Sequence, residues 1–596
     1  MLIAYCVLLF GYVSISGRPL TLHEARLPEC SREMLAKGNW LVPMDGDRPW
    51  LERPPFPHWV MLAVAKVIGQ HYDNEWSARV PCALMGLLIV LMVARMAAGW
   101  FGRGVGVIAG LALASMYEFY TYATLAEDDI FLAFLVVAAM ALFVRLEFFV
   151  DPLVEDSRLQ FAGWRPWTVV GFFVLLGLTN LAKGPIVGAA VILGTIGAYF
   201  LMPRLGWRHG NLGMFFAWPA PDRRRVRRYL WLWGWVAAAI IALSWHVFIH
   251  LRFHDPGEGY LANLRYDFLQ THEFDEPWWF YGPTLLGVAM PWTPAAIVAL
   301  FMTARRAWRQ RDRALRFLWC WAIVPIIVLS LPHRKHHHYL VPSLAPWAIL
   351  AALGVRPIAQ HMFEAVAWSR RPRFGLLAYG LPGTIALLIL AYLRKLAPTI
   401  DARAQIESAA MLIVLWNACV WAFFHGLWTT NGKWMLAAIL IGVGVAYGWK
   451  QTHLPDGTVA DTQFLRHDVE AKVPPNKTLV IDAAIGPLDF FRVQYYLRGN
   501  ALLLHNLSYL RSDRIRSADV YVVARASDLA PLQMLGEARI LALSPRSPQA
   551  NVPELALFHL QFKPGLARYP PPPVSPMQAM MRAPGPQCGP ELAEGR

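Results

Sequence analysis

Long apolar segments recur along most of the chain and constrain its fold more than any other feature. A helix needs about 20 mostly apolar residues to cross the roughly 30 Å hydrocarbon core of a bilayer. Of the 596 residues, 56% are hydrophobic and only 16% are charged, which is typical of membrane proteins. A scan for apolar runs predicts about thirteen membrane-spanning helices, at 1–17, 78–99, 104–122, 130–149, 167–181, 184–202, 229–250, 279–301, 315–331, 338–355, 374–393, 409–428 and 433–449.

The first of these runs, "MLIAYCVLLFGYVSIS", is short for a full span. It is not followed by the small-residue cleavage site of a secretory signal peptide. We therefore interpret it as an uncleaved first helix, with a signal peptide as the alternative.

Arginine-rich loops determine the predicted orientation, because Lys and Arg near helix ends favour the cytoplasmic side. The loops at 221–228, 304–316 and 369–374 share one side of the membrane if the N-terminus is cytoplasmic. An odd number of spans then places the C-terminal part outside the cytoplasm. The net charge of +15 is accordingly an orientation signal, and we predict no nucleic-acid partner.

The pattern changes after residue 450. Short β-type runs occur in "KTLVIDAAIG" (477–486), "ALLLHN" (501–506), "DVYVVAR" (519–525) and "ARILALS" (538–544), with a helical segment at 488–499. These runs predict an α/β domain over 451–563 that follows a membrane domain over 1–450. "IDAAIG" differs from a dinucleotide-binding glycine loop, so no nucleotide cofactor is expected. The proline-rich tail at 564–596 is predicted to be disordered.

The six cysteines are scattered, and none forms a CxxC motif or a metal-type spacing. Most lie in or beside apolar runs, where cysteine packs as a small apolar residue. Cys30 and Cys588 are the two that can meet an oxidising compartment, and nothing in the sequence pairs them.

Charged groups gather in the loops that the predicted orientation places outside. In the loop over 18–77, the segments 24–43 and 60–69 have the apolar spacing of helices that lie in the membrane interface. The prolines of "DRPWLERPPFPHW" (47–59) form a rigid turn that aims Glu52 and Arg53 in a defined direction. Charges at the rim of a helical bundle favour a reaction at the membrane surface.

Several of these stretches together resemble membrane glycosyltransferases that use polyprenyl-phosphate sugars, namely the aminoarabinose lipid A transferases (ArnT-like) and the protein O-mannosyltransferases. The matching motifs are "TLHEAR" (21–26), "SREMLAKGNWLVP" (31–43), "ERPP" (52–55), "SARVPCALMG" (77–86), "EDDIFLAF" (127–134), "LAKGPIVG" (181–188), "EPWWFYGPTLLGVAMPWTP" (276–294) and "HHYLVPSLAPWAIL" (337–350). The resemblance implies a GT-C fold, in which a mainly α, polytopic membrane domain precedes a small C-terminal α/β domain. It also implies a bacterial inner-membrane location.

The same resemblance implies catalytic positions. The acidic pair of the family's first loop corresponds to His23 and Glu24, and its second acidic position corresponds best to Asp129, with Asp128 as the alternative. His23 departs from the usual Asp, and a protonated imidazole cannot replace a carboxylate's negative charge. The structural alternative is that "HEAR" only caps a helix, with Glu24 favouring its N-terminus.

Release of a polyprenyl phosphate from a sugar requires cations that hold the departing phosphate. The candidates are Arg26, Arg53, Lys183, Arg334 and Lys335, together with the hydroxyl of Tyr339. Lys183 is the strongest single candidate, since a lysine between two apolar spans is costly unless it faces a polar cavity. Its structural alternative is snorkelling to the lipid headgroups.

The resemblance further implies a divalent metal, whose ligands correspond to Glu52 and His272, with His254 as the alternative to His272. Carboxylate and imidazole ligands accept Zn, Mg or Mn. The histidines of "HRKHHHY" (333–339) are also tempting ligands, but close histidines in a basic loop more often face water or phosphates.

The predicted protein is thus an integral-membrane glycosyltransferase that takes a sugar from a polyprenyl-phosphate donor. Its acceptor is a lipid A-like glycolipid, as in the lipid A transferases, or a protein hydroxyl, as in the O-mannosyltransferases. The alternative from another class is a lipid-linked sugar transporter or flippase. Carriers commonly contain repeated halves and polar groups at the midplane, whereas no repeat is visible here.

Overall fold

The computed structural model describes residues 1–45, 48–51, 53–69, 72, 74–149, 166–183, 186–201, 226, 228–253, 276–310, 312–368, 385–395, 400–452, 461–474, 477–482, 485, 487–497, 501–504, 507–511, 515, 517–544 and 554–564. It consists of two compact units. The first comprises Met1–Arg18, Arg53–Trp245 and Tyr260–Leu454. The second comprises Pro19–Glu52, His246–Gly259 and Pro455–Arg596.

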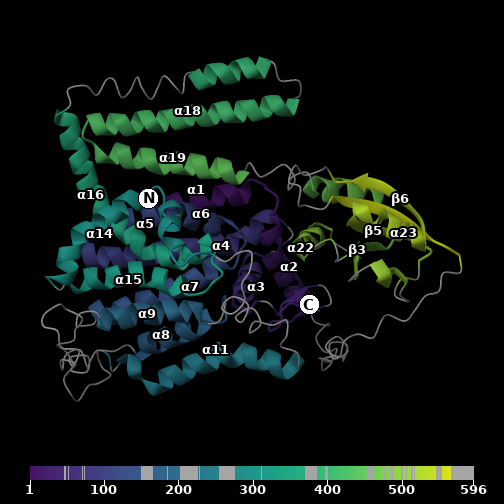
Figure 1. Cartoon of the computed structure of the whole chain (residues 1–596), viewed down its shortest axis with the longest axis horizontal. Coiled ribbons are helices and arrows are strands. Elements are labelled where there is room, and N and C mark those ends of the chain that lie inside the picture. The colour runs from purple at the N-terminus through teal and green to yellow at the C-terminus, as the bar shows by residue number, and fades with distance from the viewer. Residues whose placement is uncertain are drawn as a thin grey trace, which may run out of the picture. The chain divides into compact units, whose positions relative to one another are not determined.

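The first unit is helical and contains most of the predicted apolar runs (Figure 1). Its longer elements are α1 (Leu2–Ile15), α3 (Phe56–Ile68), α4 (Glu75–Phe101), α5 (Arg103–Ala114), α6 (Tyr117–Thr124), α7 (Asp129–Val144), α8 (Pro166–Thr179), α9 (Val187–Leu201), α13 (Tyr281–Val288), α14 (Thr293–Trp308), α15 (Arg313–Leu329), α16 (Leu344–Trp368), α18 (Ile400–Trp428) and α19 (Gly432–Thr452). Helix α11 (Leu232–Phe253) begins in the first unit and ends in the second.

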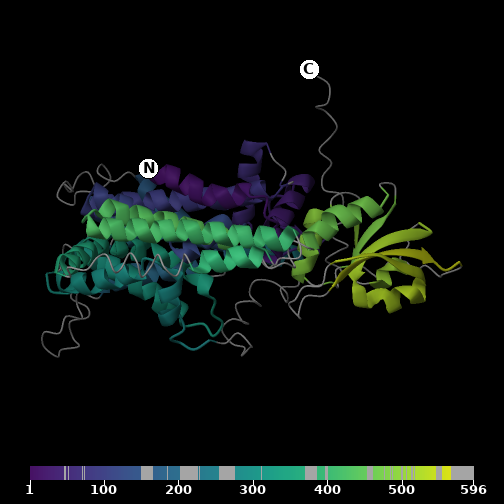
Figure 2. The same ribbon diagram turned by 90° about the horizontal axis from the view of Figure 1, so that it is seen from above.

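Within the described residues, six helices are long and apolar enough to cross a membrane, and eight spans result if each of two bent helix pairs counts as one. A further four apolar helices are shorter. Helices α18 and α19 are joined by a turn at Thr429–Asn431 and run alongside each other (Figures 1 and 2). The chain is therefore mainly helical with several apolar spans, as the sequence predicts, while the count of thirteen stays a prediction.

Two runs predicted as spans are each divided by a bend. The run 104–122 divides into α5 and α6, which are bent by 66°, and the run 279–301 divides into α13 and α14, which are bent by 119°. Pro291 and Pro294 lie at the second break, and proline cannot donate the backbone hydrogen bond that would continue a helix. Hydrogen bonds join the two breaks: the backbone N–H of Tyr117 donates to Met290 O at 3.0 Å, and the indole Nε1 of Trp292 donates to Ser115 Oγ at 2.8 Å.

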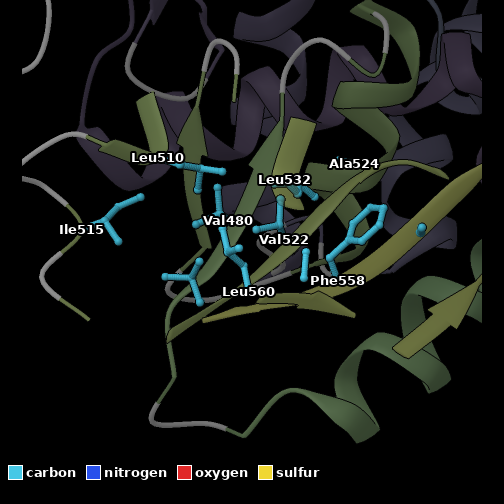
Figure 3. Packing of buried hydrophobic residues seen from close by; sticks show 11 residues of the cluster. Val480, Leu510, Ile515, Val522, Ala524, Leu532, Phe558 and Leu560 are labelled. Carbon is cyan, nitrogen blue, oxygen red and sulfur yellow. The ribbon is translucent and has the colours of Figure 1, made fainter. Parts of the chain in front are cut away.

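The second unit contains a five-stranded sheet in the order β4-β3-β5-β7-β6. Strands β3 (Leu479–Asp482), β4 (Ala501–Leu504) and β5 (Asp519–Arg525) are parallel, whereas β7 (Leu555–Phe562) runs antiparallel to both β5 and β6 (Gly536–Leu543). Helices α22 (Pro487–Tyr496) and α23 (Leu529–Leu535) connect the strands. Figure 3 shows the apolar core, to which Val480, Val522 and Leu560 contribute from three neighbouring strands.

The four predicted strands and the helix of this α/β region are confirmed. The sequence prediction missed β7, although this strand lies between β5 and β6 and is buried along most of its length. Its run "LALFHLQF" is almost continuously apolar, so it lacks the alternation that marks a half-buried strand. The tail beyond residue 564 lies outside the described residues.

The second unit also includes α2 (Leu22–Lys37) and a two-stranded hairpin of β1 (Met44–Asp45) and β2 (Arg48–Pro49). The backbone N–H of Leu20 donates to the hydroxyl of Tyr496 on α22 at 2.8 Å, and Arg32 Nη2 donates to Gln494 O at 3.3 Å. The segment that the sequence assigns to an outer loop is thereby packed on the C-terminal part of the chain. Cys30 is buried, and Cys588 lies outside the described residues.

Candidate active site

A buried ion pair stands at the centre of the candidate site. Asp129 is the first residue of α7, where the positive end of the helix dipole favours a carboxylate. Lys183 lies in the turn that follows α8, and its Nζ donates to Asp129 Oδ2 at 2.5 Å. Lys183 is only 8% exposed and Asp129 only 4%. Burial lowers the pKa of Lys183, and the Asp129 carboxylate opposes this shift.

A second pair adjoins the first in the sequence. Arg53 Nε lies 3.7 Å from Oδ2 of Asp128, which is the N-cap residue of α7. The start of α3 is attached to the turn that carries Lys183, because Phe56 N donates to Leu181 O at 3.0 Å. Consecutive carboxylates are thus matched to cations from two separate segments. The sequence left the choice between Asp128 and Asp129 open, and the structure gives each its own cation.

Tyr339 completes this group from a third segment. It belongs to the 3₁₀-helix η6 (His337–Ser343), and its ring centroid lies 5.2 Å from Lys183 Nζ. This distance permits a cation–π interaction. The structure therefore brings together four of the predicted site residues: Arg53, Asp129, Lys183 and Tyr339. Arginine and lysine beside each other can hold phosphate oxygens, and a carboxylate can polarise or deprotonate an acceptor.

The basic residues just before η6 make different contacts. Arg334 Nε donates to His336 Nε2 at 3.2 Å. Burial and the nearby cations Arg334 and Lys183 lower the pKa of His336 to about 4, so this imidazole is neutral at physiological pH. Lys335 is buried, and its Nζ donates to the backbone carbonyls of Glu276 at 2.7 Å and His333 at 3.3 Å. Lys335 thus holds this loop to the segment before α13.

Two residues of α6 also reach the histidine run, and the sequence analysis missed both. Glu118 is 1% exposed, and its Oε1 lies 2.5 Å from His337 Nδ1. Tyr122 stacks obliquely on His338, with ring centroids 5.4 Å apart. The sequence did contain a signal for Glu118, which is a glutamate inside an apolar helical run. A charged residue in such a run usually has a specific partner.

The motif "TLHEAR" belongs to the second unit, where it begins α2. Thr21 and Glu24 form a capping box: Glu24 Oε2 accepts from Thr21 N at 3.0 Å, and Glu24 N donates to Thr21 Oγ1 at 3.3 Å. The Arg26 guanidinium lies 5.2 Å from the ring centroid of Trp50, and His23 is exposed. The capping role of Glu24 is real, and the catalytic roles of His23 and Glu24 stay predictions.

The predicted metal ligands Glu52 and His272, and the alternative His254, lie outside the described residues. Among the residues that are described, no group of three or more His, Cys, Asp or Glu side chains is arranged to hold a metal ion.

Comparisons with known proteins show which families this chain is similar to. A family model described as dolichyl-phosphate-mannose-protein mannosyltransferase matches residues 52–245. Undecaprenyl phosphate-alpha-4-amino-4-deoxy-L-arabinose arabinosyl transferase from Aeromonas salmonicida is 25% identical over 496 residues, which is 80% of this chain and 80% of the relative. The protein of the same name from an Enterobacter species is 26% identical over 466 residues, covering 74% of this chain and 75% of the relative.

Solved structures show the same fold. ArnT from Cupriavidus metallidurans bound to undecaprenyl phosphate superposes with a TM-score of 0.66 and 19% identity, over 93% of this chain and 96% of that one. The apo state of that protein gives a TM-score of 0.65 with 21% identity and the same coverage.

Proposed function

We propose that this chain, an ArnT-like glycosyltransferase of the GT-C type, transfers a sugar from an undecaprenyl-phosphate carrier to an acceptor outside the cytoplasm. The resemblance drawn from the sequence motifs is confirmed by the relatives and the fold. A lipid-linked sugar transporter or flippase is correspondingly disfavoured.

The observation that carries the proposal is the pairing of Lys183 with Asp129 and of Arg53 with Asp128 at the start of α7. When the sugar leaves, the carrier phosphate gains one negative charge. Two cations held beside it stabilise that charge where it develops. Arg53 can grip two phosphate oxygens in parallel, while Lys183 acts as a point charge. Arg26, Arg334 and Tyr339 are further donor-binding candidates.

The carboxylates and His23 serve the acceptor in this proposal. Asp129 provides negative charge near the anomeric carbon or acts as a base. The family resemblance also implies a catalytic role for Glu24 and for His23, which stands where the family usually has Asp. An acceptor that is already an anionic phosphate needs little base catalysis, whereas a hydroxyl acceptor requires a base. We therefore propose a phosphate-bearing, lipid A-like glycolipid as the acceptor, with a protein hydroxyl as the second candidate.

The membrane arrangement follows the arginine-rich loops. We propose about thirteen spans in a bacterial inner membrane, a cytoplasmic N-terminus and an extracytoplasmic C-terminal α/β region. A divalent metal, which Glu52 and His272 would hold, also stays a proposal.

The test is transfer by the purified full-length protein in lipid nanodiscs. Labelled undecaprenyl-phosphate aminoarabinose or a polyprenyl-phosphate mannose is offered with lipid A or with an acceptor peptide. We expect transfer to lipid A, and we expect Asp129→Asn and Glu24→Gln to lower it strongly. Arg306→Ala is the matched control, since Arg306 pairs with Asp312 in an exposed bridge that contains none of the site residues.

Unchanged transfer by both carboxylate variants would disprove the proposed site. Transfer to the peptide alone would favour the mannosyltransferase-like alternative. If the protein moves the labelled lipid across a sealed bilayer without glycosyl transfer, the flippase hypothesis replaces the present one.

A further inference from the structure

The histidine run 336–338 is the feature that the proposed function does not use. It lies immediately before Tyr339, whose ring contacts Lys183, so the run adjoins the proposed phosphate site. His336 stacks on His338 with centroids 5.2 Å apart and planes at 13°. His338 in turn meets Tyr339 edge-on at 4.9 Å. The middle imidazole, His337, meets His338 edge-on, with ring centroids 5.4 Å apart.

Helix α6 holds the run from one side. Glu118 and Tyr122 are four residues apart and therefore lie on one face of α6. They contact the consecutive residues His337 and His338. Helix α6 begins at Tyr117, whose backbone N–H donates to Met290 O. The bent helix thus places a carboxylate against an imidazole of a segment more than 200 residues away.

The two partners differ in accessibility. The Glu118 side chain is 2% exposed, whereas that of His337 is 59% exposed. A buried carboxylate is costly unless it is paired, so Glu118 needs the contact with Nδ1. Nδ1 faces the buried carboxylate, and the opposite ring nitrogen, Nε2, belongs to an exposed side chain. This arrangement of a buried carboxylate behind an accessible imidazole orients the ring and sets which nitrogen meets a ligand.

We propose that His337 is a proton donor to the leaving phosphate and that Glu118 is its positioning residue. The inference rests on the proposed function and concerns the same site. In the transfer step, the bond between the anomeric carbon and the phosphate oxygen breaks, and its electron pair goes to the phosphate. A bond forms between the anomeric carbon and an acceptor oxygen. The imidazolium Nε2 proton passes to a phosphate oxygen, and the neutral imidazole regains a proton from water.

The test measures kcat and KM of the full-length protein with undecaprenyl-phosphate aminoarabinose and lipid A. A positioned proton donor contributes about 100-fold or more to a rate. We expect His337→Ala to lower kcat by about 100-fold while the Kd for undecaprenyl phosphate changes less than about 3-fold. Added imidazole should restore at least about a tenth of the lost rate, because it can occupy the space that the substitution opens.

Three further variants sharpen the result. His337→Gln keeps a neutral N–H donor and fills the space, so it should be slow and insensitive to imidazole. Glu118→Gln should lower kcat by about 10-fold and leave the Kd for undecaprenyl phosphate near the wild-type value. His333→Gln is the matched control, because His333 is an exposed histidine of the same loop and should transfer at the wild-type rate.

A His337→Ala variant with kcat within about 2-fold of wild type would overturn the inference, and so would a loss that imidazole does not restore. Either result leaves the proposed function intact as long as the wild-type protein transfers sugar. Absence of transfer by the wild-type protein would overturn both proposals together.

Discussion

Lys183 Nζ and Asp129 Oδ2 lie 2.5 Å apart although 54 residues separate them in the chain. Both side chains are nearly excluded from solvent. Removal of one partner from such a pair leaves an uncompensated buried charge, which costs more than the intact pair contributes. Substitutions in this pair should therefore change both the stability and the activity of the protein, and a suitable pair of variants can separate these two effects.

We expect Lys183→Met to lower the free energy of unfolding by about 3 kcal/mol, because the Asp129 carboxylate loses its partner. The double variant Lys183→Met/Asp129→Leu should recover most of that stability, since no buried charge remains. It should nevertheless stay inactive, because the phosphate loses its cation. SDS titration of the purified protein measures the stability, and labelled-sugar transfer measures the activity. A double variant as unstable as the single one would contradict this account of the pair.

Arg53 makes a longer contact with Asp128, and its side chain is 24% exposed, so it should matter more for the donor than for the fold. We expect Arg53→Lys to weaken undecaprenyl-phosphate binding by about 10-fold, because lysine cannot form two parallel bonds to a phosphate. The thermal midpoint should change little. Isothermal titration with undecaprenyl phosphate in nanodiscs checks the Kd. Equal affinities of Arg53→Lys and wild type would argue against phosphate contact by Arg53.

The bond between Trp292 Nε1 and Ser115 Oγ joins the two helix breaks, and both residues are buried. We expect Ser115→Ala to cost about 1–3 kcal/mol in the free energy of unfolding, because the indole N–H is left without its acceptor. Trp292→Phe in the Ser115→Ala background removes that N–H and should recover part of the loss. A double-mutant cycle measured by SDS titration gives the coupling. A coupling near zero would show that this bond does not stabilise the two breaks.

The C-terminal sheet carries a charge cluster that should respond to pH. Hydrogen bonds from Lys477, at 2.8 Å, and from His559, at 3.2 Å, lower the pKa of Asp519. The hydrogen bond to Asp519 raises the pKa of Lys477. A lowered carboxyl pKa contributes stability that is present above the unfolded pKa, about 4, and is lost as the pH falls through the folded value.

For Lys477 the sign is opposite: its contribution is present below the unfolded pKa, about 10.4, and disappears as the pH rises through the folded value. Asp519→Asn should therefore lower the thermal midpoint slightly between about pH 5 and 9 and match wild type more closely at pH 3. The groups are partly exposed, so the effect should shrink in high salt. A constant difference across the whole pH range would exclude ionisation of Asp519 as its cause.

Much of the helical and strand structure is predictable from local pattern. Apolar runs long enough to span a bilayer indicate helices wherever they occur, because an unpaired backbone cannot lie in hydrocarbon. The β-type runs at 477–486 and 519–525 become β3 and β5 for a similarly local reason. The sequence analysis missed strand β7 because its run is almost continuously apolar and so lacks the alternation of a half-buried strand.

Local sequence pattern is enough to indicate a mainly helical membrane protein, most of its described elements and the charged residue types that can hold a phosphate. Only the tertiary structure decided the partners: Lys183 with Asp129, Arg53 with Asp128, and Glu118 with His337. It also joined the two helix breaks, since the N–H of Tyr117 at the start of α6 donates to the carbonyl of Met290 just after α13. The physical reason is the distance along the chain over which each kind of interaction acts. Helix and strand formation depends on near neighbours, whereas a buried charge is stable only beside a partner that the fold delivers from a distant segment.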